Sequence, residues 1–227
     1  MHSMTRTPDP CLPQPEKRTL DILVADDHAI IRIGLKVIIK NILGDVHIDE
    51  AIDGESVIRK LKSEPFDLLI LDINMPRTEP FSLTNYLLNE FHMLKLLIFT
   101  VNQELNFAKR FLQMGVHGYV SKQSKQEELG WAIQKILAGQ TYISEHLSEI
   151  ISNELVSPKN DNPFMDLSDR EFEVVLQILK GYSVNEIATT LHLNRSTVGT
   201  HKSRILKKLG LSNIMDLHSL AKRHNVL

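Results

Sequence analysis

Acidic side chains stand at the ends of two apolar runs, where they could hold a divalent cation. Asp26 and Asp27 directly follow the run 20–25, and Asp72 directly follows the run 68–71. Clustered carboxylates repel one another unless a cation lies between them, and Mg²⁺ prefers oxygen ligands of this kind. A carboxylate beside such an ion can attack phosphorus and form an acyl phosphate. These residue types therefore predict metal-assisted phosphoryl chemistry on Asp72.

Two more polar side chains end apolar runs and suit a phosphoryl group. Lys122 would balance the charge on a phosphorylated Asp72, and Thr100 would hydrogen-bond a phosphoryl oxygen. Taken singly, each of the five residues has an ordinary alternative, such as a helix cap for Asp26 or Asp27, or a solvated surface position for Lys122. Their shared placement at strand ends favours a single site.

Strand-like runs alternate with helical patterns across residues 20–138. We expect strands at 20–25, 46–51, 68–71, 96–100 and 117–120, and helices at about 30–42, 55–62, 83–91, 104–114 and 127–138. Such alternation predicts an α/β fold with a parallel sheet covered on both faces. Ligands of these sheets bind outside the carboxyl ends of the strands, where all five polar residues are expected.

The pattern from Leu167 onward is helical throughout. Ser168 and Ser183 each precede a glutamate by three residues, which predicts two capping boxes, and Asn194 suits the start of a third helix. We expect four helices, at about 168–181, 183–191, 194–209 and 213–222. The third is basic and carries no acidic residue; its cations are Arg195, Lys202, Arg204, Lys207 and Lys208. A short helix, a turn and a basic helix predict a helix-turn-helix, with a solvated basic face as the alternative.

Length and charge predict two domains. Residues 163–227 carry nine Lys/Arg and six Asp/Glu, a net charge of +3, whereas the remainder carries 17 and 22, a net charge of −5. We expect a disordered tail over 1–18, an α/β domain over 19–141, a linker over 142–162 and a helical domain over 163–227. Cys11 is the only cysteine, and no run of 18 apolar residues occurs, so we expect a cytoplasmic protein that does not enter a membrane.

Residues 20–140 resemble the receiver domain of response regulators. The motifs that match are Asp26-Asp27, Leu71-Asp72-Ile73-Asn74-Met75-Pro76, Thr100 and Gly118-Tyr119-Val120-Ser121-Lys122. The resemblance implies a flavodoxin-like (βα)5 fold with Asp72 as the phosphoacceptor. It implies Mg²⁺ bound by Asp27, Asp72 and the main-chain carbonyl of Asn74, with Asp26 assisting through water. It also implies that Thr100 and Tyr119 form a switch pair, although a plain core aromatic is the alternative for Tyr119.

Residues 167–211 resemble the LuxR/NarL-type helix-turn-helix. The motifs that match are Leu167-Ser168-Asp169-Arg170-Glu171, Asn185-Glu186-Ile187-Ala188, Ser196-Thr197-Val198-Gly199-Thr200-His201 and Lys208-Leu209-Gly210. The expected core residues are Ile187, Ala188, Leu191, Val198, Ile205 and Leu209. The expected DNA-facing residues are Thr197, Thr200, Lys202, Ser203, Arg204 and Lys207.

Three positions depart from these families. Arg77-Thr78-Glu79-Pro80 stands where glycines usually follow the proline, so we expect a different loop path. Gly199 replaces a common lysine, which removes one expected DNA contact and costs helix stability. Ile214 stands where a basic residue is frequent.

Together the two resemblances imply a transcription regulator, not an enzyme, that receives a phosphoryl group from a histidine kinase. They imply double-stranded DNA as a partner and a homodimer. A phosphatase of the haloacid dehalogenase type is discounted, because it needs an aspartate where Asn74 stands. A protein-binding adaptor and phosphate-independent regulation stay open as alternatives.

Overall fold

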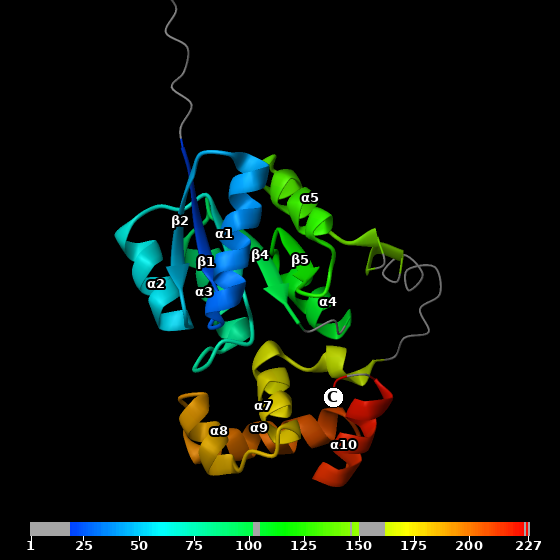
Figure 1. Cartoon of the computed structure of the whole chain (residues 1–227). Coiled ribbons are helices and arrows are strands. Elements are labelled where there is room, and N and C mark those ends of the chain that lie inside the picture. The colour runs from blue at the N-terminus through cyan, green and yellow to red at the C-terminus, as the bar shows by residue number, and fades with distance from the viewer. Residues whose placement is uncertain (1–18, 102–104, 146, 150–161, 225, 227) are drawn as a thin grey trace, which may run out of the picture.

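The computed structural model describes residues 19–101, 105–145, 147–149, 162–224 and 226 (Figure 1). The expected tail over 1–18 and most of the second half of the expected linker lie outside these residues. None of the helices in the described ranges is long and apolar enough to cross a membrane.

A five-stranded parallel sheet forms the centre of the N-terminal domain, with strand order β2-β1-β3-β4-β5. Its strands are β1 (Leu20–Ala25), β2 (Val46–Ala51), β3 (Leu68–Leu71), β4 (Lys95–Thr100) and β5 (Gly118–Ser121). The predicted strands differ from these by one residue at most. Because β1 lies between β2 and β3, the chain reverses its order there, and a crevice opens at the carboxyl ends of β1 and β3.

Helices cover both faces of the sheet. On one face lie α1 (Ala29–Leu43) and α5 (Gln126–Leu137), and on the other lie α2 (Gly54–Ser63), α3 (Pro80–Glu90) and α4 (Leu105–Met114) (Figure 1). Successive side chains of one strand therefore enter two different cores: Leu69 and Leu71 face one, Leu68 and Ile70 the other. This double burial explains the continuous apolar runs and confirms the flavodoxin-like fold.

Local signals explain where two of these helices begin. Asp53 caps α2 by accepting a hydrogen bond from Ser56 N, and the Ser56 side chain bonds back to the cap backbone. Pro80 occupies the first turn of α3, so that helix begins three residues earlier than predicted. Proline suits this position because the first helical N–H has no partner within the helix.

The C-terminal domain is helical, as predicted. A short turn, η1 (Pro163–Asp166), precedes α7 (Asp169–Leu179), α8 (Val184–Thr190), α9 (Arg195–Lys208) and α10 (Ile214–Arg223). Ser168 and Ser183 form the two predicted capping boxes. The prediction for Asn194 was wrong in part: it occupies the N-cap position of α9, but its side chain makes no capping hydrogen bond.

The chain that follows α5 packs back onto the N-terminal domain. Tyr142, the first residue of the expected linker, is buried and pairs with Gly118 of β5. Its N–H donates to the carbonyl of His117 at 2.8 Å. Residues of the expected linker thus extend the core of the α/β domain.

Candidate functional site

The sheet brings the predicted acidic residues together at one edge. Ala25 of β1 pairs with Leu71 of β3, so Asp26 and Asp72, the next residue of each strand, lie side by side. Both carboxylates are buried, with 1% and 2% of the residue exposed. This edge is the crevice where the strand order reverses.

Lys122 lies between these two carboxylates. Its Nζ is 2.7 Å from Asp72 Oδ2 and 2.6 Å from Asp26 Oδ2, and its side chain is 8% exposed. The backbone N–H of Lys122 donates to the carbonyl of Thr100 at 2.8 Å, which fixes the lysine at the end of β5. A buried ammonium group shared by two buried carboxylates offsets their repulsion, and it can contact an anion placed on either of them.

Four side chains at this edge lie close enough together that they could share a cation. One ligand atom from each of Asp26, Asp27, His28 and Asp72 lies within 4.8 Å of the others. Asp27 is the more exposed carboxylate, which leaves the cluster open to solvent. The carboxylate oxygens suit a hard divalent cation. His28 was not among the predicted residues; its place directly after Asp26-Asp27 was the available signal, and its Nδ1 lies 2.9 Å from Asp27 Oδ1.

Asn74 joins Asp72 to Thr100. Its backbone N–H donates to Asp72 Oδ1 at 3.0 Å, and its side-chain Nδ2 donates to Thr100 Oγ1 at 2.8 Å. Thr100 is fully buried at the end of β4. The sequence-based prediction gave Asn74 only a main-chain role, whereas the structure also uses its side chain to position the threonine.

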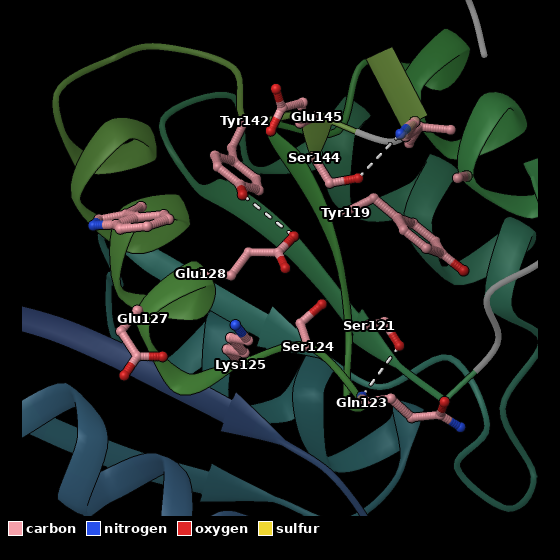
Figure 2. Close-up of a pocket in the computed structure, with 13 residues that line it drawn as sticks. Tyr119, Ser121, Gln123, Ser124, Lys125, Glu127, Glu128, Tyr142, Ser144 and Glu145 are labelled. Carbon is pink, nitrogen blue, oxygen red and sulfur yellow. Dashed lines mark hydrogen bonds between the residues drawn. The ribbon is translucent and has the colours of Figure 1, made fainter. Parts of the chain in front are cut away.

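Tyr119 lies on β5, next to the strand β4 that ends in Thr100, and its ring faces the core. It is 5% exposed and stacks on Phe111 of α4, with the ring centroids 6.3 Å apart. Tyr119 also borders an open groove of about 790 Å³ between β5, α5 and the chain after α5 (Figure 2). In that groove the Tyr142 hydroxyl points to Glu128, 3.3 Å away. Tyr119 is therefore a core aromatic in this conformation, and its role as a switch stays a prediction.

The loop after Met75-Pro76 reaches a glycine-like conformation without glycine. Arg77 itself has φ = 53°, in the left-handed region, so our reason for expecting a different path was wrong. An ion pair with Asp53 at 3.1 Å and the hydrogen bond from Gly54 N to Thr78 Oγ1 at 2.9 Å hold the loop against α2. A non-glycine residue in this region stores about 1–3 kcal/mol of strain.

The predicted DNA-facing residues share one helix but differ in exposure. Thr200, Ser203, Arg204 and Lys207 are exposed on α9, whereas Thr197 and Lys202 are partly buried. Lys202 borders a small groove that also includes Ile214 and Tyr182. The two hydroxyls bond to their own helix, Thr200 Oγ1 to Ser196 O and Ser203 Oγ to Gly199 O.

Comparison with known families agrees with both halves of the chain. Residues 22–134 match the response regulator receiver domain, and residues 165–221 match the family of bacterial regulatory proteins called luxR. Response regulator UvrY from Escherichia coli (strain K12) is 30% identical over 208 residues, which cover 91% of this chain and 95% of UvrY. The chain belongs to the response regulators. Response regulator GacA from Pseudomonas aeruginosa is 32% identical over 209 residues, 92% of this chain and 98% of GacA.

Solved structures share the arrangement of this response regulator. RcsB from Salmonella enterica serovar Typhimurium, bound to promoter rprA in the presence of the phosphomimetic BeF3⁻, is 25% identical with a TM-score of 0.70. That match covers 90% of this chain and 99% of RcsB. A second RcsB structure, from Salmonella typhimurium, has a TM-score of 0.72 at 24% identity and covers 91% and 98% of the two chains; it supports the fold alone.

Two positions in the C-terminal domain of this response regulator gain a structural explanation. Lys208, counted among the basic residues of the recognition helix, bonds to Glu171 at 2.7 Å and to the carbonyl of Asp166 at 3.1 Å. It therefore holds α9 against α7. Ile214 packs on the core at the start of α10, which accounts for an apolar residue there.

Proposed function

We propose that this response regulator accepts a phosphoryl group on Asp72 from a partner histidine kinase and thereby controls DNA binding by its C-terminal domain. The observation that carries the proposal is the buried Asp72 carboxylate, 2.7 Å from Lys122 Nζ at the strand-order reversal. A carboxylate oxygen attacks phosphorus, and the bond between phosphorus and the donor imidazole nitrogen breaks. Its electron pair returns to the imidazole.

The donor set of the cluster fits Mg²⁺. Asp26, Asp27 and Asp72 supply carboxylate oxygens, and the resemblance adds the main-chain carbonyl of Asn74. When bound, the ion neutralises oxygens of the transferring phosphoryl group. The chain's own residues do the rest: Asp72 provides the nucleophile, Lys122 pairs with the new negative charge, and Asn74 positions Thr100 to contact a phosphoryl oxygen.

The exposed face of α9 supplies the proposed DNA contacts. Arg204 and Lys207 are exposed cations suited to phosphates, which would make affinity depend on salt. Thr200 and Ser203 share that face, and Thr197 and Lys202 lie near the start and middle of the helix, where side chains reach base edges. RcsB bound to its promoter is the relative that supports duplex DNA as the partner.

The domain limits and the assembly are part of the same proposal. We assign the receiver to 19–141, the linker to 142–162 and the DNA-binding domain to 163–227, with the first linker residue, Tyr142, packed on the receiver core. The protein acts in the cytoplasm as a homodimer, since paired recognition helices suit two half-sites of a duplex. Phosphorylation of Asp72 regulates the protein itself, and we propose that the protein is not an enzyme that acts on a separate substrate.

Phosphorylation of the purified chain tests the assignment of Asp72. Acetyl phosphate with Mg²⁺ should add one phosphoryl group by intact mass, removable by hydroxylamine as expected of an acyl phosphate. The matched control is Asp72→Asn, which keeps the shape of the side chain and removes the nucleophile. Equal labelling of the Asp72→Asn protein would refute the assignment.

A further inference from the structure

We propose that Arg32, through its forked guanidinium group, positions the turn that carries two of the metal-binding carboxylates and so raises the affinity of the site for Mg²⁺ without being a ligand. The inference rests on the function proposed above. Arg32 lies in the first turn of α1, where its backbone N–H donates to the carbonyl of His28. The turn between β1 and α1, which carries Asp26 and Asp27, is therefore within reach of its side chain.

The Arg32 side chain bends back along α1 to the end of β1. Its Nη1 donates to the main-chain carbonyl of Asp26 at 2.8 Å. Long side chains in a helix point toward the N-terminus of that helix, so this direction is an ordinary one. The Arg32 side chain is 13% exposed, and Asp26 is 1% exposed. Since a buried carbonyl that loses its donor is costly, this hydrogen bond restrains the turn.

Other contacts hold the remaining polar atoms of Asp26. Its N–H donates to the carbonyl of Ala51 on β2 at 3.1 Å. Its Oδ1 accepts a hydrogen bond from His28 N at 2.9 Å, and its Oδ2 lies 2.6 Å from Lys122 Nζ. The hydrogen bond from Arg32 adds the carbonyl oxygen to this set, so both the main chain and the side chain of Asp26 are fixed in place.

The restraint on Asp26 extends to Asp27, the next residue. The carbonyl of Asp26 belongs to the peptide group that leads into Asp27, and because a peptide group is planar, a restraint on its oxygen also fixes the Cα of Asp27. The Asp27 side chain is 31% exposed and contacts His28 Nδ1 at 2.9 Å, but the His28 side chain is itself 64% exposed. Such an exposed contact is a weak restraint. The direction of the Asp27 carboxylate therefore depends on the backbone that Arg32 holds.

Glu50 of β2 holds the Arg32 side chain in place. Arg32 Nε donates to Glu50 Oε2 at 2.9 Å, and Lys36, one turn further along α1, pairs with the same carboxylate. Hydrogen bonds from Lys36 and Arg32 hold the pKa of Glu50 below its usual range, so Glu50 is ionised at neutral pH. A planar guanidinium group can donate to Glu50 and to the Asp26 carbonyl at once, whereas lysine offers a single ammonium group. Arg32 therefore links β2 to the turn that carries the carboxylates.

The charge of Arg32 and its positioning contact have opposite effects on Mg²⁺ affinity. A cation near the carboxylates repels Mg²⁺, so on charge alone the removal of Arg32 should tighten metal binding. The loss of a group that orients metal ligands weakens binding, usually by about 10–100-fold. Lys36 is the matched control, because it is a cation of the same helix and pairs with the same Glu50 carboxylate, whereas the hydrogen bond to the Asp26 carbonyl comes from Arg32.

Metal binding by the full chain, without a phosphoryl donor, tests the positioning role. Electron paramagnetic resonance measures free Mn²⁺ during a titration of the protein, and competition with Mg²⁺ gives the Mg²⁺ affinity. We expect Arg32→Met to weaken Mg²⁺ binding about tenfold, the lower end of the usual effect. Lys36→Met should bind Mg²⁺ as tightly as the wild type or slightly more tightly, because only a nearby positive charge is lost. Equal or tighter binding of Mg²⁺ by Arg32→Met would overturn the proposal.

A second variant covers the case in which Arg32→Met fails to fold. Arg32→Lys keeps the charge but loses the fork, so it should also weaken Mg²⁺ binding, and wild-type affinity in this variant would overturn the proposal.

The rate of phosphorylation by acetyl phosphate is a further readout. Arg32→Met should need about tenfold more Mg²⁺ for half of its maximal rate and should reach the wild-type rate when Mg²⁺ is saturating. A rate that stays low at saturating Mg²⁺ would overturn a role confined to metal binding. A wild-type chain that takes up no phosphoryl group would instead overturn the proposed function, while the metal affinities would still decide the role of Arg32.

Discussion

Replacement of Gly199 by alanine should stabilise the protein. Gly199 lies within α9, and a Cβ built there meets no atom within 4 Å outside its own helix and neighbours. Its φ is not in the left-handed region, so alanine fits without strain. Since glycine in a helix interior costs up to about 1 kcal/mol relative to alanine, we expect Gly199→Ala to add about 0.5–1 kcal/mol to the free energy of unfolding.

Urea unfolding followed by circular dichroism measures this gain, which should raise the midpoint of the C-terminal transition at an unchanged slope. Gly199→Lys should also gain stability from the loss of the glycine. In addition, it places a cation on the helix face that carries Ser203, one turn further along. We measure how the affinity of each variant for a fluorescent random-sequence duplex falls with salt. The slope of log affinity against log salt concentration should be steeper by about 0.9 for Gly199→Lys than for Gly199→Ala. Gly199→Ala is the control for the helix effect alone. Equal slopes for the two variants would refute our conclusion that position 199 of α9 faces the DNA. A loss of stability in Gly199→Ala would refute our conclusion that a Cβ at position 199 meets no neighbouring atom.

Three further predictions follow from single contacts. Arg77→Gly should stabilise the receiver by about 1 kcal/mol in urea unfolding, because it relieves the positive φ and loses only an exposed ion pair; a net loss would contradict the strain argument. Lys207→Met should lower the salt slope of DNA binding by about 0.9, whereas Lys208→Met should leave the slope unchanged and cost about 1 kcal/mol of stability. Burial, with Glu128 adding to it, raises the pKa of Tyr142 from 10.0 to about 12, so its contribution to stability is full below pH 10 and is lost as the pH rises through 12. Tyrosinate absorbance should lose a component that titrates near pH 12 in Tyr142→Phe; loss of a component near pH 10 would contradict the burial.

The sheet and its acidic edge could be predicted from sequence because the signals are local. Buried parallel strands appear as apolar runs, and the polar residue at the end of each run marks the edge. Asp26, Asp72 and Lys122 were predicted in this way, and the register of β1 with β3 explains their proximity. Helix starts were less accurate where the signal was a proline, as at Pro80.

The contact between the domains could not be predicted in the same way. Phe172 and Phe81 have the pattern of ordinary core residues, and only the three-dimensional arrangement shows that they pack on each other across domains. Arg110 gave no signal either, because its acceptors are more than 50 residues away; they are the carbonyls of Phe164 and Leu167 and the carboxylate of Asp169. Lys208 was counted among the cations of the basic helix, because charge is visible in a sequence. Its partner Glu171 could not be predicted, since that contact is set by the packing of α9 on α7.

DNA affinity of the full chain with and without beryllofluoride tests the central claim most directly. The duplex is a target site of this protein, identified beforehand by mapping where the protein binds. With Mg²⁺ present, beryllofluoride should increase the affinity of the wild type for that duplex and shift the protein toward the dimer. Asp72→Asn should show neither effect. Identical affinity and oligomeric state in the presence and absence of beryllofluoride, measured on wild-type protein shown to bind it, would contradict the claim that chemistry at Asp72 controls the DNA-binding domain.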